Sequence, residues 1–261
     1  MTRHERVNIA DIVDSSPIGS FHVALGIMCG MCLMIDGFDI QAIGYAAPAL
    51  IKDWHVAGSA LGPVFSAALF GILVGSLGLS VLADKVGRRP ILITATLFFS
   101  VLTFLAGQTS TLNQLFAVRF IAGIGLGGIM PNALALMGEY TPAKNRIGAM
   151  LLVANGLNLG AAIGGFIAAW LIPNFGWRAI FYFGGAVPLF IGILMIFFLP
   201  ESLQLMVLRG HERRKIQLNL RRMNPSVNGW DHAEFVVSEE KKEGVPAIHL
   251  FSGGRAVITV S

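Results

Sequence analysis

Two carboxylates and one guanidinium lie inside stretches of this sequence that are otherwise apolar. Asp36 and Asp39 fall in the run that begins at Phe21 and continues through "CLMIDGFDIQAIGYAAPAL", and Arg119 falls in the run that begins near residue 112. A charge at the centre of a bilayer costs about 2.5–3.5 kcal/mol on insertion scales, so such residues usually face a protein interior or a water-filled cavity. The chemistry open to this set is proton exchange at the carboxylates and anion binding at the arginine.

The spacing of the two carboxylates supports this interpretation. Residues three positions apart share one face of a helix, as Asp36 and Asp39 would. Carboxylates that lie close together raise each other's affinity for protons, and so does the loss of water around them. Gly37, between them, thins the helix and lets another element approach. Two hypotheses stay open: a titrating pair with Arg119 as its cationic partner, or a static ion pair that locks helices together.

The elements that must position these residues are membrane helices. The chain is 54% hydrophobic and only 13% charged, whereas soluble proteins carry about 25% charged residues. A spanning helix needs about 20 mostly apolar residues. The stretches that qualify are 21–45, 60–83, 90–108, 112–138, 147–172 and 178–199. We therefore expect an all-α membrane protein with six transmembrane helices, in which the charges lie in the outer half of the bilayer at ~1.5 Å of rise per residue.

The composition divides the chain into four parts. We expect a cytoplasmic N-terminal segment over 1–20, a six-helix bundle over 21–200, and a charged cytoplasmic loop over 201–246. The last residues, 247–261, turn apolar again and predict the start of a truncated seventh helix.

The orientation follows from the basic residues of the short loops, because cytoplasmic loops carry the excess of Lys and Arg. With the N-terminus in the cytoplasm, seven such residues lie inside and two lie outside. The inner ones are Arg3, Arg6, Lys85, Arg88, Arg89, Lys144 and Arg146, and the outer ones are Lys52 and Arg178. Because the basic residues are spread over loops between apolar runs, nucleic acid is not expected as a partner.

The link between the second and third stretches carries an ordered set of charges. It reads "GSLGLSVLADKVGRRPILI" and holds Asp84, Lys85, Gly87, Arg88 and Arg89. This pattern, at the end of a glycine-rich helix, resembles the signature loop of the major facilitator superfamily. The resemblance implies that the aspartate caps a helix and pairs with loop arginines, forming a cytoplasmic latch that breaks as the transporter opens inward.

Other segments match the same family in order, with two departures. "RFIAGIGLGG" begins at Arg119 and resembles the helix-4 motif, and "GEYTPAKNR" places Glu139 and Arg146 at the spacing of a second cytoplasmic charge cluster. Ser80 stands where the loop pattern usually has glycine, and being small it preserves close packing. Ala161 stands where drug antiporters have proline, which argues against an antiporter.

The "DGFD" of the first stretch resembles the signature of the aromatic acid:H⁺ symporters, a branch of this superfamily. The resemblance implies import of aromatic carboxylates with protons across the cytoplasmic membrane of a bacterium. It assigns proton coupling to Asp36 and Asp39, and carboxylate recognition or coupling to Arg119. "IQAIGYAAPA" looks closest to carriers of hydroxylated benzoates such as 4-hydroxybenzoate. No cofactor and no metal are implied.

The resemblance implies a fold as well. Six helices correspond to the N-terminal half of the fold, built from two inverted three-helix repeats, and a C-terminal half would be missing. We therefore predict that this chain alone does not transport. The alternatives are a sugar or other organic-anion carrier of the same superfamily, or a fragment without activity. An intramembrane protease is not supported, because no GxSG motif occurs.

Overall fold

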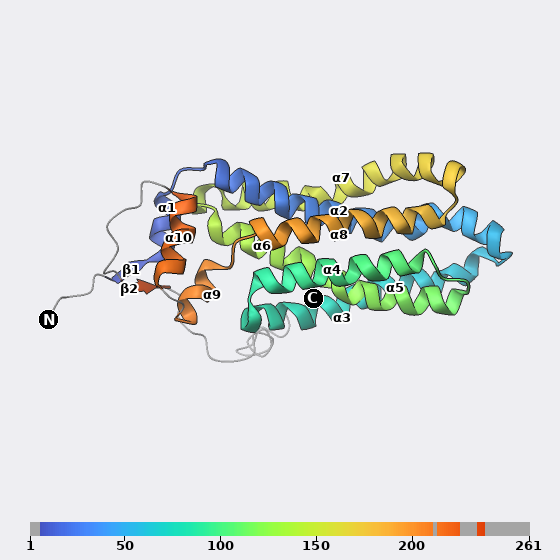
Figure 1. Ribbon diagram of the computed structural model, residues 1–261, viewed down its shortest axis with the longest axis horizontal. Helices are drawn as coiled ribbons and strands as arrows, with labels where there is room; N and C mark the ends of the chain where they lie inside the picture. Colours follow the sequence, from blue (N-terminus) through green and yellow to red (C-terminus); the bar gives the residue numbers. More distant parts are fainter. Residues whose placement is uncertain (1–5, 211–212, 225–233, 238–261) are drawn as a thin grey trace, which may run out of the picture.

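The computed structural model describes residues 6–210, 213–224 and 234–237, and almost all of this part is helical (Figure 1). The chain begins with β1 (Arg6–Asn8) and α1 (Ile9–Ser15). The long helices are α2 (Ser20–Trp54), α3 (Gly62–Val86, after the 3-10 turn Gly58–Leu61), α4 (Arg88–Ala106), α5 (Leu112–Gly127), α6 (Ile129–Tyr140), α7 (Ala143–Phe175) and α8 (Arg178–Phe198). They are followed by α9 (Leu203–Leu208), α10 (Arg213–Met223) and β2 (Glu234–Val236). The predicted start of a seventh spanning helix at 247–261 lies outside the described residues.

Six segments of the described chain are long and apolar enough to cross a membrane, with α5 and α6 counted together as one. This confirms the predicted all-α, six-span architecture of a multi-pass membrane protein. The helices run side by side along the long axis of the molecule, and the short elements gather at one end (Figure 1).

The first span is longer than the sequence predicts. We expected it to end near residue 45, but α2 continues through Pro48 to Trp54. A proline inside a spanning helix frees one backbone carbonyl, and this is tolerated because neighbouring helices re-satisfy it. The extension places Asp36 and Asp39 near the middle of a 35-residue helix.

The fourth span is broken. The stretch predicted as one helix divides into α5 and α6 at Gly128. Pro131 has no backbone N–H, so it cannot continue the hydrogen-bond ladder to the residue four positions earlier. The side-chain amide of Asn132 instead donates to the Gly128 carbonyl at 2.7 Å. The break therefore has a local cause and lies about two and a half turns beyond Arg119, near the midpoint of the span.

The spans pack in a pattern that follows from two three-helix repeats. The most extensive contacts join α2 to α7, α3 to α5 and α4 to α8. Each of these pairs takes one helix from the first three spans and one from the last three. At the α2–α7 contact, a Cβ added to Gly37 would meet the backbone of Leu157, and one added to Gly160 would meet the backbone of Met34. These glycines allow the close approach that small residues give spanning helices.

The apolar interior consists of two separate clusters. The first extends from α1 and α10 to Ile35, Phe99 and Leu126. The second begins at Phe38 and Ala106 and continues toward the opposite end of the bundle. Between them, at the level of residues 36–39 of α2, lies the polar layer that contains the predicted charges.

Short elements at one end form what we call the cap: β1, α1, α9, α10 and β2. The strands pair in parallel, with Val7 opposite Phe235. In α10 the apolar side chains of Ile216, Leu220 and Met223 are buried in the first cluster. The charged region predicted as a loop over 201–246 thus contains helices and a strand that pack onto the bundle.

Candidate functional site

Asp39 and Arg119 form an ion pair in the centre of the bundle. The Arg119 Nη1 atom donates to both carboxylate oxygens of Asp39, at 3.0 and 2.9 Å, and its Nη2 atom donates to the Asp39 backbone carbonyl at 3.0 Å. The Oγ1 of Thr103 donates to the same carboxylate at 2.9 Å. Side chains of α2, α4 and α5 therefore converge on one carboxylate. We call Asp36, Asp39, Thr103 and Arg119 the bundle-centre cluster.

Asp36 lies one helical turn from this pair, and it is also buried. Its exposed fraction is 4%, against 2% for Asp39 and 1% for Arg119. Among the described residues, no hydrogen bond or ion pair reaches the Asp36 carboxyl, although the two aspartates interact electrostatically. The structure therefore brings together all three charges predicted from the sequence, but only Asp39 is paired with the arginine.

The electrostatics of the cluster follow from this pairing. One carboxylate and one guanidinium cancel, whereas removing either partner would leave an uncompensated charge inside the membrane. The Arg119 Nε atom is buried and has no hydrogen-bond partner among the described residues. Three of the five N–H donors of the guanidinium are thus held by Asp39, and the Nε–H is left without an acceptor among the described residues.

The helices hold the cluster through packing on both sides. Thr103 sits between Phe99 and Ala106 on α4, which belong to different apolar clusters. On α5, Leu115 and Leu126 flank Arg119 in the same way. The polar layer is therefore enclosed along the bundle axis by two apolar clusters, which exclude bulk water and strengthen the electrostatic interactions inside it.

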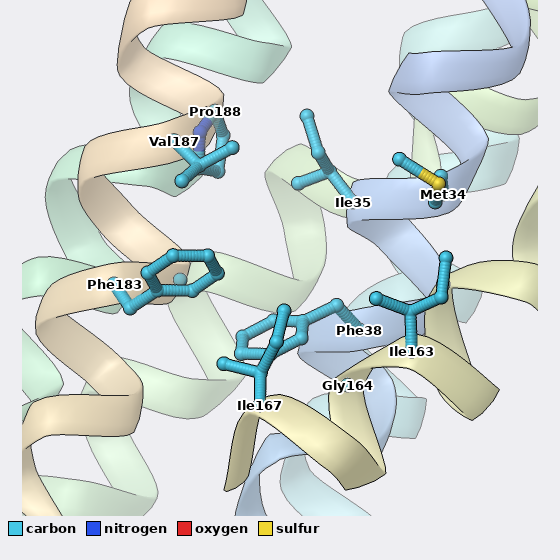
Figure 2. Close-up of a pocket in the computed structure, with 11 residues that line it drawn as sticks. Met34, Ile35, Phe38, Ile163, Gly164, Ile167, Phe183, Val187 and Pro188 are labelled. Atoms are coloured by element: carbon cyan, nitrogen blue, oxygen red, sulfur yellow. The ribbon is translucent and has the colours of Figure 1, made fainter. Parts of the chain in front are cut away.

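A small apolar cavity lies beside the cluster, where its lining residues Ile35 and Phe38 are the chain neighbours of Asp36 and Asp39. It has a volume of about 100 Å³ and is lined by residues of α2, α7 and α8. Figure 2 shows Phe38 and Phe183 facing each other across it, and their ring centroids are 5.6 Å apart. Ligand pockets usually measure about 300–1,000 Å³. This cavity is therefore too small and too apolar to hold a carboxylate substrate.

A second set of charges lies at the cap end of the bundle, around the loop between α3 and α4. The guanidinium of Arg88 forms an ion pair with Glu139, at the end of α6. The backbone N–H of Arg89 donates to a Glu201 carboxylate oxygen at 3.2 Å, and its side chain donates to the Leu199 carbonyl at 2.8 Å. We call Arg88, Arg89, Glu139 and Glu201 the loop cluster.

The loop itself turns at a glycine. Gly87 has φ of 127°, a conformation that residues with a side chain rarely adopt. A Cβ at this position would also approach the Glu201 carboxylate to 2.7 Å. Gly87 thus supplies the turn that the sequence motif predicted.

The pairing that the motif implies for Asp84 is not formed among the described residues. Asp84 was expected to pair with a loop arginine, but its side chain and that of Lys85 are exposed, and Arg88 pairs with Glu139 instead. Arg146, assigned with Glu139 to a second cytoplasmic charge cluster, donates to the Thr141 carbonyl at 3.3 Å and lies 3.7 Å from Asp14 of α1, whereas Glu139 pairs with Arg88. The reason is geometric, because Glu139 faces the α3–α4 loop whereas Arg146 begins α7 on the side of the cap.

Sequence reasoning missed two residues of these clusters. Thr103 belongs to a series of buried hydroxyls on α4, with Thr96 and Ser100, spaced so that they share one helix face. That spacing was available in the sequence as a signal. Glu201 lies in the "PES" segment that closes the last span, and its role at the start of α4 depends on a contact between residues far apart in the sequence.

Comparison with known proteins matches the chain to a family model and to named relatives. The family model described as Major Facilitator Superfamily matches residues 29–240. The chain is 41% identical over 243 residues to the 4-hydroxybenzoate transporter PcaK of Acinetobacter baylyi, covering 93% of this chain and 53% of that protein. It is 33% identical over 247 residues to the gallate transporter of Pseudomonas putida, covering 94% of this chain and 55% of that protein.

Solved structures share the fold. The proton:xylose symporter XylE superposes with a TM-score of 0.68 at 21% identity, over 78% of this chain and 50% of that one. A bacterial homologue of the human lysosomal transporter Spinster superposes with a TM-score of 0.61 at 20% identity, over 71% of this chain and 44% of that one. The chain spans about half the length of the relatives it matches, in agreement with the prediction that it corresponds to the N-terminal half of the fold.

Proposed function

Because the chain belongs to the Major Facilitator Superfamily, we propose that it forms one half of a proton-coupled carrier for small aromatic carboxylates, of which 4-hydroxybenzoate is the type. Its function is transport and not enzymatic catalysis. The substrate class is supported by relatives named as transporters of 4-hydroxybenzoate, gallate and benzoate. The observation that carries the mechanism is the buried Asp39–Arg119 pair, with an unpaired Asp36 one turn away.

The proposed coupling is an exchange of partners at Arg119. In the structure the guanidinium is neutralised by Asp39. When Asp39 takes up a proton, the arginine loses its counter-ion, and the carboxylate of an incoming substrate restores the balance. The buried charge is the same before and after, so one proton accompanies one carboxylate without leaving an unpaired ion in the membrane.

Asp36 is proposed as the second proton-exchanging group. An ionised carboxylate without a cation or donor is costly inside a membrane, and no described residue supplies either to Asp36. Since Asp36 is three positions from Asp39 on the same helix, a proton held by one changes the cost of charging the other. We therefore assign the two residues to one coupled titration.

The loop cluster is proposed to act as a gate. Its contacts tie the start of α4 to the end of α6 and to the residues after α8. Asp84 and Lys85, exposed beside it, remain free to contact the other half of a complete carrier. We propose that these contacts close the cytoplasmic side in one state and open in the next.

The proposed orientation has the N-terminus and the cap in the cytoplasm of a bacterium, across its inner membrane. The basic residues of the described cap and of the loops beside it support this orientation, because cytoplasmic segments carry the excess of Lys and Arg. The residues concerned are Arg88, Arg89, Lys144, Arg146, Arg209, Arg214, Lys215, Arg221 and Arg222.

The substrate cavity is proposed to lie between this bundle and a second one, as in carriers built from two repeats. A chimera that joins this chain to the second half of the Acinetobacter baylyi relative provides the test. We expect an inward proton gradient to stimulate its uptake of 4-hydroxybenzoate, and benzoates but not hexoses to compete. We expect Asp39→Asn to abolish the response to the gradient, whereas the 261-residue chain alone gives no uptake.

Competition by hexoses would favour a sugar carrier. Uptake that does not respond to the proton gradient would show that transport is not coupled to protons. Uptake by the chain alone, in cells without an endogenous carrier, would show that the second half is not required.

A further inference from the structure

A cavity with charged and aromatic walls lies at the end of the bundle opposite the cap. Its volume is about 460 Å³, within the usual range of about 300–1,000 Å³ for ligand pockets. It lies between the end of α2 and the turn that joins α7 to α8, and its chemistry is supplied by Lys52, His55, Phe175, Trp177 and Arg178. No residue of the bundle-centre cluster lines it, so it is a separate site.

The floor of this outer cavity is formed by side chains that share one carboxylate. Trp177 is buried, and its Nε1 atom donates to the Asp53 carboxylate at 3.0 Å. Arg178 donates to the same carboxylate oxygen through Nη1 at 3.2 Å, and its guanidinium carbon lies 4.4 Å from the centroid of the Trp177 ring. One carboxylate therefore holds both an indole and a guanidinium in place, and only one nitrogen of that guanidinium is engaged in the described contacts.

The rim of the cavity is exposed and carries the remaining positive charge. Lys52 and His55 lie on one side of it and are exposed. Phe175, on the other side, is 64% exposed, although its ring is apolar. Lys52 and Arg178 outweigh the single carboxylate of Asp53, so the cavity presents a net positive charge beside a phenyl ring.

We propose that this outer cavity binds aromatic carboxylates. The ligand's ring lies against Phe175 over the Trp177 floor, where aromatic pairs gain contact energy beyond their buried area. Its carboxylate is held by Lys52 and by the free nitrogens of Arg178. In the orientation proposed above the cavity faces outward, so it concentrates substrate at the entrance. The role as an entrance site rests on the proposed function, whereas binding itself follows from the lining.

The test is a binding measurement without a transport step. The full chain is placed in lipid nanodiscs, and 4-fluorobenzoate is titrated while its ¹⁹F NMR line is followed. We expect saturable broadening that indicates an affinity about twofold to fivefold weaker in Lys52→Gln, as for other exposed charge contacts, and weaker still in Lys52→Glu. Lys144→Gln, an exposed lysine at the cap end, serves as the matched control and should bind as the parent does.

The aromatic part is tested by Phe175→Leu, which keeps an apolar side chain but removes the ring. We expect it to reduce the advantage of benzoate over cyclohexanecarboxylate as competitors. Phe166→Leu, which changes another exposed phenylalanine of α7 that does not line the cavity, should leave that advantage unchanged. Binding that is unaffected by both Lys52 substitutions would overturn the proposal. So would equal competition by cyclohexanecarboxylate or inorganic phosphate, which would indicate a simple anion site. If the chimera showed no proton-driven uptake, the proposed function would be wrong. The proposal that this cavity binds aromatic carboxylates would not be affected, because the NMR titration measures binding alone.

Discussion

The bundle-centre cluster and the loop cluster contain the same chemical pair, a carboxylate and a guanidinium, in two different environments. At the centre, the side chains of Arg119 and Asp39 are 1% and 2% exposed and lie between two apolar clusters. In the loop cluster, the Arg88 side chain is 21% exposed, and that of its partner Glu139, near the end of α6, is 5% exposed. The central pair lies well inside its helices, whereas the loop pair joins the first residue of α4 to the last turn of α6.

This difference separates two tasks. An ion pair enclosed by apolar side chains can open only if another charge or a proton replaces the lost partner. An ion pair at the end of a span, with a partly exposed arginine such as Arg88, can open with water replacing part of the lost contact, so opening it costs less than opening the central pair. The central pair therefore suits chemical exchange of a proton for a carboxylate, and the loop pair suits mechanical opening.

The largest expected effect comes from breaking each pair at its arginine. Arg119→Met leaves the Asp39 carboxylate buried without a cation, and we expect the free energy of unfolding to fall by about 3–5 kcal/mol. Arg88→Met is the matched change in the loop cluster, and we expect a smaller loss of about 1–3 kcal/mol, because the 5%-exposed Glu139 carboxylate it leaves without a cation lies at the end of a helix and not in the centre of the bundle. Unfolding by SDS titration of the reconstituted chain measures both. Equal losses would show that the two environments do not differ as described.

A smaller effect is expected from the hydroxyl that supports the central carboxylate. Thr103→Val removes one hydrogen bond to Asp39, and we expect a loss of about 1–2 kcal/mol. Thr96→Val is the control, because the Thr96 hydroxyl is equally buried but donates to the Leu92 carbonyl of its own helix. If both variants lose the same stability in the same titration, Thr103 is an ordinary core threonine.

The loop cluster is expected to respond weakly to the loss of a charge. Glu201 accepts from the backbone N–H of Arg89, in the first turn of α4. Glu201→Gln keeps an acceptor but removes the negative charge from the helix N-terminus, which should cost about 0.3–1 kcal/mol and less at high salt. Thermal unfolding at two salt concentrations checks this. A loss that does not depend on salt would point to packing and not to charge.

The smallest effect is expected at Asp84. Its side chain is exposed, and no hydrogen bond or ion pair reaches it from the described residues. Asp84→Asn should therefore change the stability of this chain by no more than about 0.5 kcal/mol, while reducing uptake by the two-half chimera. A loss above that value in the single chain would place Asp84 in a contact within this half.

Much of the fold could be predicted, because the length of a spanning helix is set by the thickness of the bilayer. The break at Gly128 and the extension of α2 beyond Pro48 could not, since a proline is compatible with both outcomes. Apolar length alone does not show whether neighbouring helices will satisfy the freed carbonyl. The cap was missed because its helices depend on burying three side chains of α10 in a core made by distant residues.

The charged residues of the candidate site could be predicted from the sequence, but which of them form ion pairs could not. The cost of a buried charge identifies Asp36, Asp39 and Arg119 from the sequence alone. Which aspartate meets the arginine depends on how α2 is rotated against α5, and residues three apart on one helix face leave this open. In the loop cluster, the sequence offers Arg88 more than one carboxylate as a partner, and the choice depends on where the helix ends lie in space. The pairing of Arg88 with Glu139 could therefore not be predicted.

The central claim is that binding of an aromatic carboxylate and uptake of a proton occur together at the bundle-centre cluster. Adding 4-hydroxybenzoate to the two-half chimera in weakly buffered solution with a pH indicator tests it directly. The exchange at Arg119 predicts that about one proton is taken up from solution for each carboxylate bound. It also predicts that Asp39→Asn abolishes this proton uptake. Binding of the carboxylate by the parent chimera with no change in the proton concentration would contradict it.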